Sequence, residues 1–163
     1  MSVKEDLVRL AWRLRIGGWP LALLATALAC ACSSQPGHAP DDLGAVKQRI
    51  DQQGAVLVDV REQSEWNAGH VAGAYWLPTK ALAKAHGTNE TARLAELLAG
   101  LPKDKPIYCH CAKGVRALAA AKILTAHGYQ ATALKPGYDD LVAAGFTPEP
   151  AGSKADPSST PIN

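Results

Sequence analysis

The sequence has almost no excess of charge of either sign. Its 17 Lys and Arg residues nearly balance its 15 Asp and Glu residues, which leaves a formal net charge of +2. The first 29 residues hold four basic residues against two acidic ones and account for that excess, so the rest of the chain is close to neutral. A nucleic-acid-binding protein needs a basic face that meets the phosphate backbone. The charge pattern therefore excludes nucleic acid as an expected partner.

The sequence also lacks an apolar run of the length usual for a membrane-spanning helix. Residues 16–32 contain no charged side chain, but a bilayer requires roughly 20 apolar residues, and this run is shorter. A basic front, a Leu- and Ala-rich middle and small residues at the end are typical of a secretory signal. We expect residues 1–32 to be a signal peptide or lipoprotein signal, or alternatively an uncleaved N-terminal anchor helix. Either interpretation predicts an exported protein, periplasmic or at the cell surface, and attached to the membrane by a lipid or by the helix.

Cysteine is scarce, with four residues in two closely spaced pairs. Residues 27–30 resemble a bacterial lipoprotein cleavage box, which predicts a lipid anchor on Cys30, and Cys32 is a weaker second candidate. The second pair is Cys109 and Cys111. Four cysteines could by number hold one zinc ion, but signal cleavage would separate the two pairs, so no metal site is expected.

Composition divides the remainder into a linker, a domain and a tail. Residues 33–40 are rich in Ser, Gly and Pro and indicate a flexible linker. Residues 41–150 are long enough for one hydrophobic core, and residues 151–163 have the composition of a disordered tail. Within the domain, apolar runs alternate with helical patterns, which predicts the α/β class with a mostly parallel central sheet and helices on both faces. The expected strands are 55–60, 75–77, 106–110 and 130–134, and the expected helices are 41–50, 62–68, 79–86, 90–99, 115–127 and 139–144. Residues 69–73 are expected to form a turn.

The most informative stretch is 107–117. A short apolar run ends at Cys111, and an Ala-rich run of strong helical preference follows Arg116. This pattern predicts a buried strand, a tight loop and the start of a helix, whose first N–H groups have no partner inside the helix. The positive end of the helix favours a thiolate, and Lys113 and Arg116 add positive charge. Together these residues indicate a nucleophilic thiolate that stabilises an anionic adduct, at the sheet edge where α/β proteins bind ligands.

The same loop, with two further motifs in the same order along the chain, resembles the rhodanese-like sulfurtransferases. The resemblance implies a rhodanese-like fold, a Cys111 persulfide, a small anionic sulfur donor such as thiosulfate, and a thiol or cyanide acceptor. It requires no cofactor, and we expect a monomer. The motifs are residues 111–116, residues 57–62 with 65–66, 69–74 and 77–78, and residues 136–141 with 144–146.

The resemblance also assigns roles to individual residues. Cys111 is the expected catalytic nucleophile, and Asp59 and Arg61 are expected to form a buried or half-buried ion pair that supports the site from below. The chain departs from the usual pattern at Ala112, which often is Arg, and at Ala117, where a hydroxyl is frequent. The expected donor-binding loop consists of Ala112, Lys113, Gly114, Val115 and Arg116.

Two alternatives to a sulfurtransferase remain open at the level of the sequence. Cys109 lies two residues before Cys111, on the same face of a regular strand. We favour a buried structural thiol, but a resolving thiol would make the protein a thiol–disulfide redox protein that uses both cysteines. A non-catalytic sulfur-carrier or binding module is the second alternative. His110, between the two thiols, should point to the opposite face of the strand and pack there.

Overall fold

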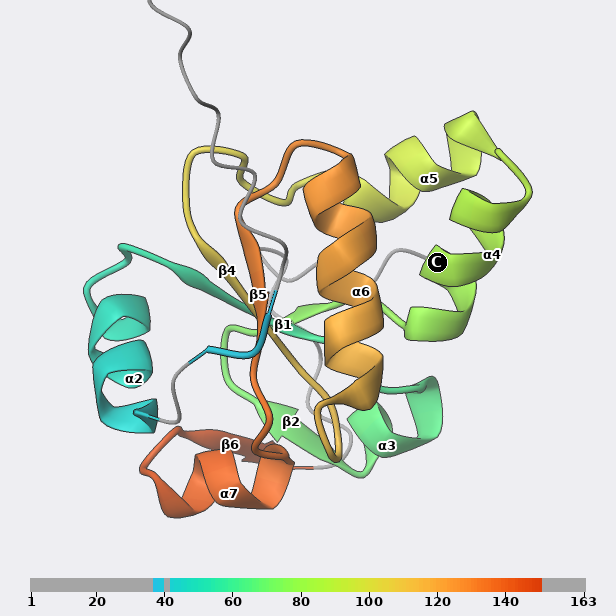
Figure 1. Ribbon diagram of the computed structural model, residues 1–163. Helices are drawn as coiled ribbons and strands as arrows, with labels where there is room; N and C mark the ends of the chain where they lie inside the picture. Colours follow the sequence, from blue (N-terminus) through green and yellow to red (C-terminus); the bar gives the residue numbers. More distant parts are fainter. Residues whose placement is uncertain (1–36, 40–41, 151–163) are drawn as a thin grey trace, which may run out of the picture. The chain divides into compact units, whose positions relative to one another are not determined.

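The structure, a computed structural model, describes residues 37–39 and 42–150 (Figure 1). The signal or anchor expected in residues 1–32, with Cys30, and the tail expected in residues 151–163 lie outside the described residues. They stay predictions.

A four-stranded parallel sheet forms the centre of the domain (Figure 1). Strands β1 and β4 lie at the centre of the sheet, and nearly all of their side chains, mostly apolar, are buried on both faces, as expected for inner parallel strands. Their register pairs Val56 with Ile107 and Asp59 with His110. The α/β class and the mostly parallel sheet are thereby confirmed. The strand order is β3 (Tyr75–Trp76), β1 (Val56–Asp59), β4 (Ile107–His110) and β5 (Ala131–Ala133).

Helices cover the sheet, and a separate apolar core lies on each side. One core joins the sheet to α4, α5 and α6, and the other joins it to α2, α3 and α7. Within the described ranges, no helix is both long and apolar enough to cross a membrane. The helices are α2 (Leu43–Asp51), α3 (Gln63–Asn67), α4 (Thr79–Gly87), α5 (Thr91–Leu98), α6 (Val115–Ala126) and α7 (Tyr138–Ala143).

The alternation of side chains along β4 decides which face each functional residue reaches. Ile107, Cys109 and Cys111 belong to the core under α4, α5 and α6. Tyr108 belongs to the opposite core, and His110 is next to Asp59 of β1. Both expectations for this strand are confirmed: the two cysteines share one face, and His110 packs away from them.

One element that we expected to be a turn is a strand. Residues Gly69–Val71 form β2, which pairs antiparallel with β6 (Pro148–Pro150) in a second, two-stranded sheet. His70 lies inside this unit, with its Nε2 atom 3.2 Å from a carboxylate oxygen of Glu149. Pairing between segments almost eighty residues apart leaves no local pattern, which is why the sequence indicated only a turn.

The described part of the expected linker also belongs to the domain. Ala39 N–H donates to the carbonyl oxygen of Ala133 at 2.8 Å, and Ala133 N–H donates to that of Gly37 at 3.2 Å. His38 therefore forms a parallel bridge with Ala133 on β5. Residues 37–39 differ from a free tether because two backbone hydrogen bonds fix them to the sheet edge.

Candidate active site

The loop after β4 places Cys111 at the carboxyl end of the sheet. The Cys111 side chain is buried, with 1% of the residue exposed. Gly114 is the N-cap of α6 and adopts φ = 78°, a left-handed conformation that glycine reaches without steric cost. Cys111 therefore lies directly before the free N–H groups of a twelve-residue helix, where negative charge is stabilised.

Neighbouring backbone holds this loop from outside. A Cβ atom added to Gly137 would lie only 2.5 Å from the carbonyl oxygen of Ala112, so the two backbones are in direct contact. A Cβ atom on Gly114 would come within 3.0 Å of the Cα atom of Lys135 and 3.3 Å of the carbonyl oxygen of Leu134. The segment between β5 and α7 therefore fixes the loop at two points.

Arg116 lies in the first turn of α6 and forms a two-pronged ion pair with Glu65 of α3. Its two terminal nitrogens donate to the two carboxylate oxygens at 2.6 and 2.8 Å. The hydrogen bonds from Arg116 lower the pKa of Glu65 to about 2. The same pairing raises the pKa of Arg116, and the nearby Cys111 side chain adds a smaller effect in the same direction. A negative charge on Cys111 would therefore be stabilised by this guanidinium.

Beneath the loop, on the other face of the sheet, lies a layer of buried charge. Arg61 binds both carboxylate oxygens of Asp59, at 2.6 Å for its closest contact, and also donates to the carbonyl oxygen of Gly69 at 2.7 Å. The Tyr138 ring covers the guanidinium, with 4.7 Å from Cζ to the ring centroid. The expected ion pair of Asp59 and Arg61 is confirmed, and it is fully buried.

His110 adds a third ionisable side chain to this layer. Its Nε2 atom is 3.5 Å from Asp59 Oδ2, and neither ring nitrogen makes a hydrogen bond within the described part of the chain. Burial lowers the pKa of His110 to about 4, although Asp59 opposes that effect. The imidazole is therefore neutral at physiological pH and contributes no charge to the site.

The environment of Cys109 differs from that of Cys111. Cys109 is completely buried, and burial raises the pKa of its thiol to about 12. Both cysteines are free thiols. Cys109 is thus kept protonated and out of solvent, as expected for a structural thiol.

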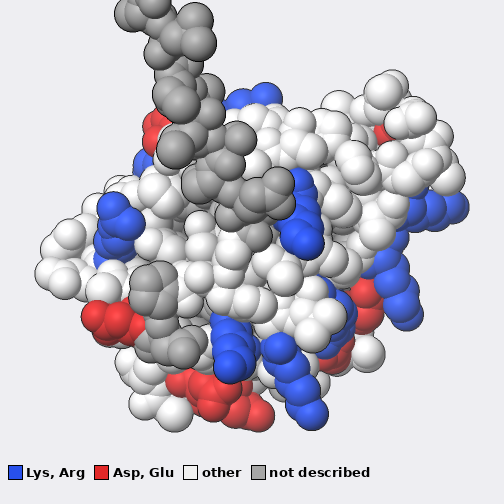
Figure 2. Space-filling view, viewed as in Figure 1, with Lys and Arg blue, Asp and Glu red and all other residues white. Residues whose placement is uncertain are grey.

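Two exposed lysines lie in the loop and in the segment that contacts it. Lys113 and Lys135 are both exposed. In the space-filling view, Lys and Arg side chains gather in the lower part of the molecule, beside a group of Asp and Glu side chains (Figure 2). An anionic donor approaching this end of the sheet would meet positive charge before it reached Cys111.

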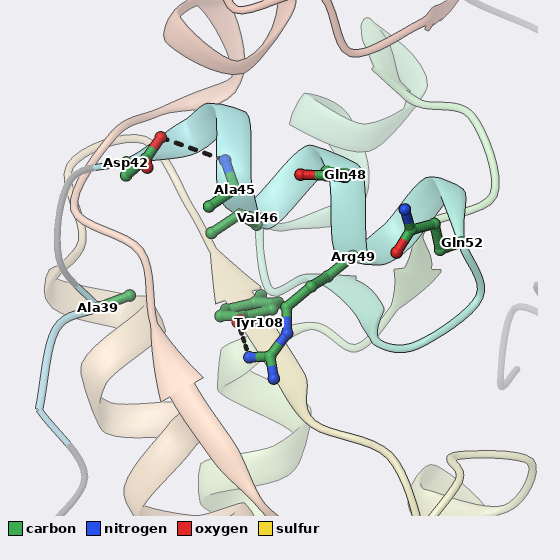
Figure 3. Close-up of a pocket in the computed structure, with 8 residues that line it drawn as sticks. All are labelled: Ala39, Asp42, Ala45, Val46, Gln48, Arg49, Gln52 and Tyr108. Atoms are coloured by element: carbon green, nitrogen blue, oxygen red, sulfur yellow. Dashed lines mark hydrogen bonds between the residues drawn. The ribbon is translucent and has the colours of Figure 1, made fainter.

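A separate cavity lies on the α2 side and is not part of this site. It has a volume of about 590 Å³, and no residue of the loop lines it. Inside it, Arg49 donates a hydrogen bond of 3.2 Å to the hydroxyl of Tyr108 (Figure 3). Its lining residues are Ala39, Asp42, Ala45, Val46, Gln48, Arg49, Gln52 and Tyr108.

The structure brings the expected loop residues together but adds two that the sequence did not indicate. Glu65 was noted only as part of a motif, and its separation of 51 residues from Arg116 gives no local sign of their pairing. His38 lies in the expected linker, yet its Nε2 atom is 3.0 Å from the position that a Cβ atom on Gly114 would occupy.

In the described ranges, no three metal-ligating side chains form a group that could hold an ion.

Comparison with known proteins gives a consistent result. A family model described as a rhodanese-like domain matches residues 42–144. The thiosulfate:glutathione sulfurtransferase of Saccharomyces cerevisiae is 35% identical over 94 residues, which are 55% of this chain and 66% of that protein. The thiosulfate sulfurtransferase GlpE of Pseudomonas fluorescens is 28% identical over 82 residues, which are 50% of this chain and 64% of that protein. The chain thus spans slightly less than two thirds of the length of each.

Solved structures match in the same region. A crystal structure of a protein from Anabaena sp. has a TM-score of 0.53 and 25% identity, and the match covers 68% of this chain and 80% of that one. A rhodanese-related protein from Thermoplasma volcanium has a TM-score of 0.50 and 21% identity, with 66% and 93% covered. The second similarity shows the shared fold.

Proposed function

Because the chain belongs to the rhodanese-like domain family, we propose that it is a sulfurtransferase that transfers a sulfane sulfur through Cys111. The observation that supports this most is the position of Cys111, which is buried at the N-terminus of α6 beside the Arg116 guanidinium. Such a place stabilises a sulfur anion through backbone N–H groups and one fixed positive charge.

The proposed reaction has two displacement steps. The Cys111 thiolate attacks the outer sulfur of a donor such as thiosulfate, and the S–S bond of the donor breaks with its electron pair leaving on sulfite. The product is a persulfide on Cys111. A thiolate or cyanide then attacks the terminal sulfur, and the electron pair of the persulfide bond returns to Cys111. No electrons are gained or lost overall, so neither a metal nor an organic cofactor is required.

Sulfur transfer is tested by mass spectrometry of the full chain after incubation with thiosulfate. We expect the peptide that contains Cys111 to gain one sulfur atom and to lose it when cyanide is added, with thiocyanate as the product. Cys111→Ser should abolish both events. Thiocyanate formation at the same rate in Cys111→Ser would disprove the proposal. Sulfur uptake on Cys111 without any turnover would instead support the sulfur-carrier alternative.

The redox alternative depends on Cys109, and the environment of that thiol argues against it. A thiol with a pKa of about 12 supplies almost no thiolate at physiological pH, and its burial restricts access. We expect Cys109→Ala to keep sulfur transfer within about tenfold of the wild type, a change of ~1.4 kcal/mol in the barrier. An equal loss of activity in Cys109→Ala and Cys111→Ser, with both variants folded, would favour the disulfide mechanism.

We also propose that the domain acts outside the cytoplasm as a lipid-anchored protein. The support is the sequence of residues 1–32 and the cleavage box that ends at Cys30. Labelling of a bacterial host with a palmitate analogue should mark a chain that begins at Cys30 and should fail for Cys30→Ala, while Cys32→Ala serves as the matched control. Labelling that survives Cys30→Ala would refute Cys30 as the anchor.

A further inference from the structure

Residues 37–39 lie outside the part of the chain that matches the family, yet they reach the active-site loop. Two backbone hydrogen bonds hold them parallel to β5 at its exposed edge. Ala39 then borders the cavity beside Tyr108 (Figure 3). The backbone of the segment is therefore held at the sheet edge, which brings the exposed side chain of its central residue, His38, close to the loop.

The imidazole of His38 lies close to Gly114. A Cβ atom on Gly114 would be 3.0 Å from His38 Nε2, 3.0 Å from the Cα atom of Lys135 and 3.3 Å from the carbonyl oxygen of Leu134. Backbone atoms of the β5–α7 connection thus approach Gly114 closely, and the imidazole of His38, an exposed residue, approaches it as well. Gly114 is itself the residue whose left-handed conformation turns the loop into α6.

We propose that His38 is a positioning residue for the Cys111 loop. Its imidazole packs on Gly114 and keeps the turn into α6 in place, so that the loop keeps its conformation between Cys111 and the start of the helix. A side chain in the segment before the family domain thereby becomes part of the machinery of sulfur transfer. The kinetic consequence depends on the proposed function, but the effect on the loop does not.

The proposal is tested in the full chain with three variants. His38→Ala removes the contact, and His38→Gln keeps a nitrogen atom at a similar reach from the backbone. Gly37→Ala is the matched control on the neighbouring residue, since a Cβ atom there would meet nothing within 4 Å. Each variant is examined by amide hydrogen exchange of the peptide that contains residues 111–118 and by steady-state kinetics with thiosulfate.

We expect His38→Ala to raise the exchange rate of the loop amides about fivefold, as the loss of one contact of ordinary strength would do. Its kcat/KM should fall by a similar factor, while exchange in β1 and the thermal midpoint stay at the wild-type values. His38→Gln should restore at least half of the loss, because the contact depends on packing and reach.

Two results would overturn the proposal. One is loop exchange in His38→Ala that equals that of Gly37→Ala. The other is loss of protection in β1 as well as in the loop, which would show a general loss of stability. If the wild-type chain transfers no sulfur at all, the proposed function fails, but the exchange measurement still decides whether His38 positions the loop.

Discussion

Two arginine–carboxylate pairs lie near Cys111, and they differ in how much water reaches them. The side chains of Asp59 and Arg61 are 0% and 7% exposed, whereas those of Glu65 and Arg116 are 34% and 32% exposed. Their closest nitrogen–oxygen distances are both 2.6 Å. The two pairs therefore have equal closest distances but very different exposure to water. This difference in exposure determines how much each pair contributes to stability.

The buried pair is part of the scaffold. Charges removed from water must be matched by partners, and Arg61 uses Asp59, the carbonyl oxygen of Gly69 and the ring of Tyr138 for this purpose. The half-exposed pair is less costly to separate, since water can solvate both groups. We therefore expect that Arg116 could exchange Glu65 for an anion, whereas separation of Arg61 from Asp59 would leave two buried charges without their partners.

The largest expected effect comes from breaking the buried pair. Asp59→Asn should lower the free energy of unfolding by about 3–5 kcal/mol, because it leaves the Arg61 charge buried without a counter-charge. Urea unfolding at pH 7 measures this change. Asp51→Asn, which breaks an exposed pair with Lys47 on α2, is the control and should cost less than about 1 kcal/mol. Equal effects of the two substitutions would contradict the distinction between the pairs.

His110 extends the buried layer and gives it a pH dependence. Its pKa is lowered from 6.5 to about 4, so the unfolded chain binds a proton more readily than the folded one. The stabilisation by neutral His110 is complete above pH 6.5 and is lost progressively as the pH falls from about 6.5 to about 4.

Between pH 7 and pH 5, we expect the free energy of unfolding to fall by about 2 kcal/mol less in His110→Phe than in the wild type. Urea unfolding at both pH values measures this difference. His86→Phe, a change at an exposed position, should leave the wild-type pH dependence in place. An unchanged pH dependence in His110→Phe would show that the buried histidine is not its source.

The smallest effect on stability, and a specific effect on activity, should follow from Glu65→Gln. The amide keeps one oxygen that can accept from Arg116 but removes the charge that competes with an anionic donor. We expect stability to change by less than about 1 kcal/mol and the KM for thiosulfate to fall about fivefold, as one charge near the site would produce.

Glu96→Gln is the control for this measurement, because Glu96 forms a similar surface pair with Arg93 on α5. It should leave the KM unchanged. A KM that rises in Glu65→Gln would show that the carboxylate acts only by holding Arg116 in place.

Local patterns explain which parts of the fold and site the sequence could predict. The apolar runs of β1 and β4, the Ala-rich start of α6 and the glycine before it are all visible within a few residues, so Cys111 could be placed at a strand end. The Glu65–Arg116 pair, the β2–β6 sheet and the contact of His38 with Gly114 each join distant segments. The residues on each side of these contacts have the types that are common in helices, turns and linkers. Their partners become visible only in the folded structure.

The contact between Gly137 and Ala112 can form only late in the synthesis of the domain. Cys109 and Cys111 leave the ribosome before β5, which pairs with Cys109 in the folded domain, and before Gly137, which contacts Ala112 of the loop. At ordinary rates of synthesis, about 25 further residues require roughly one to five seconds. During that interval the loop lacks its contact with Gly137, and both buried thiols still lack the neighbours that the later segment brings to the sheet and the loop.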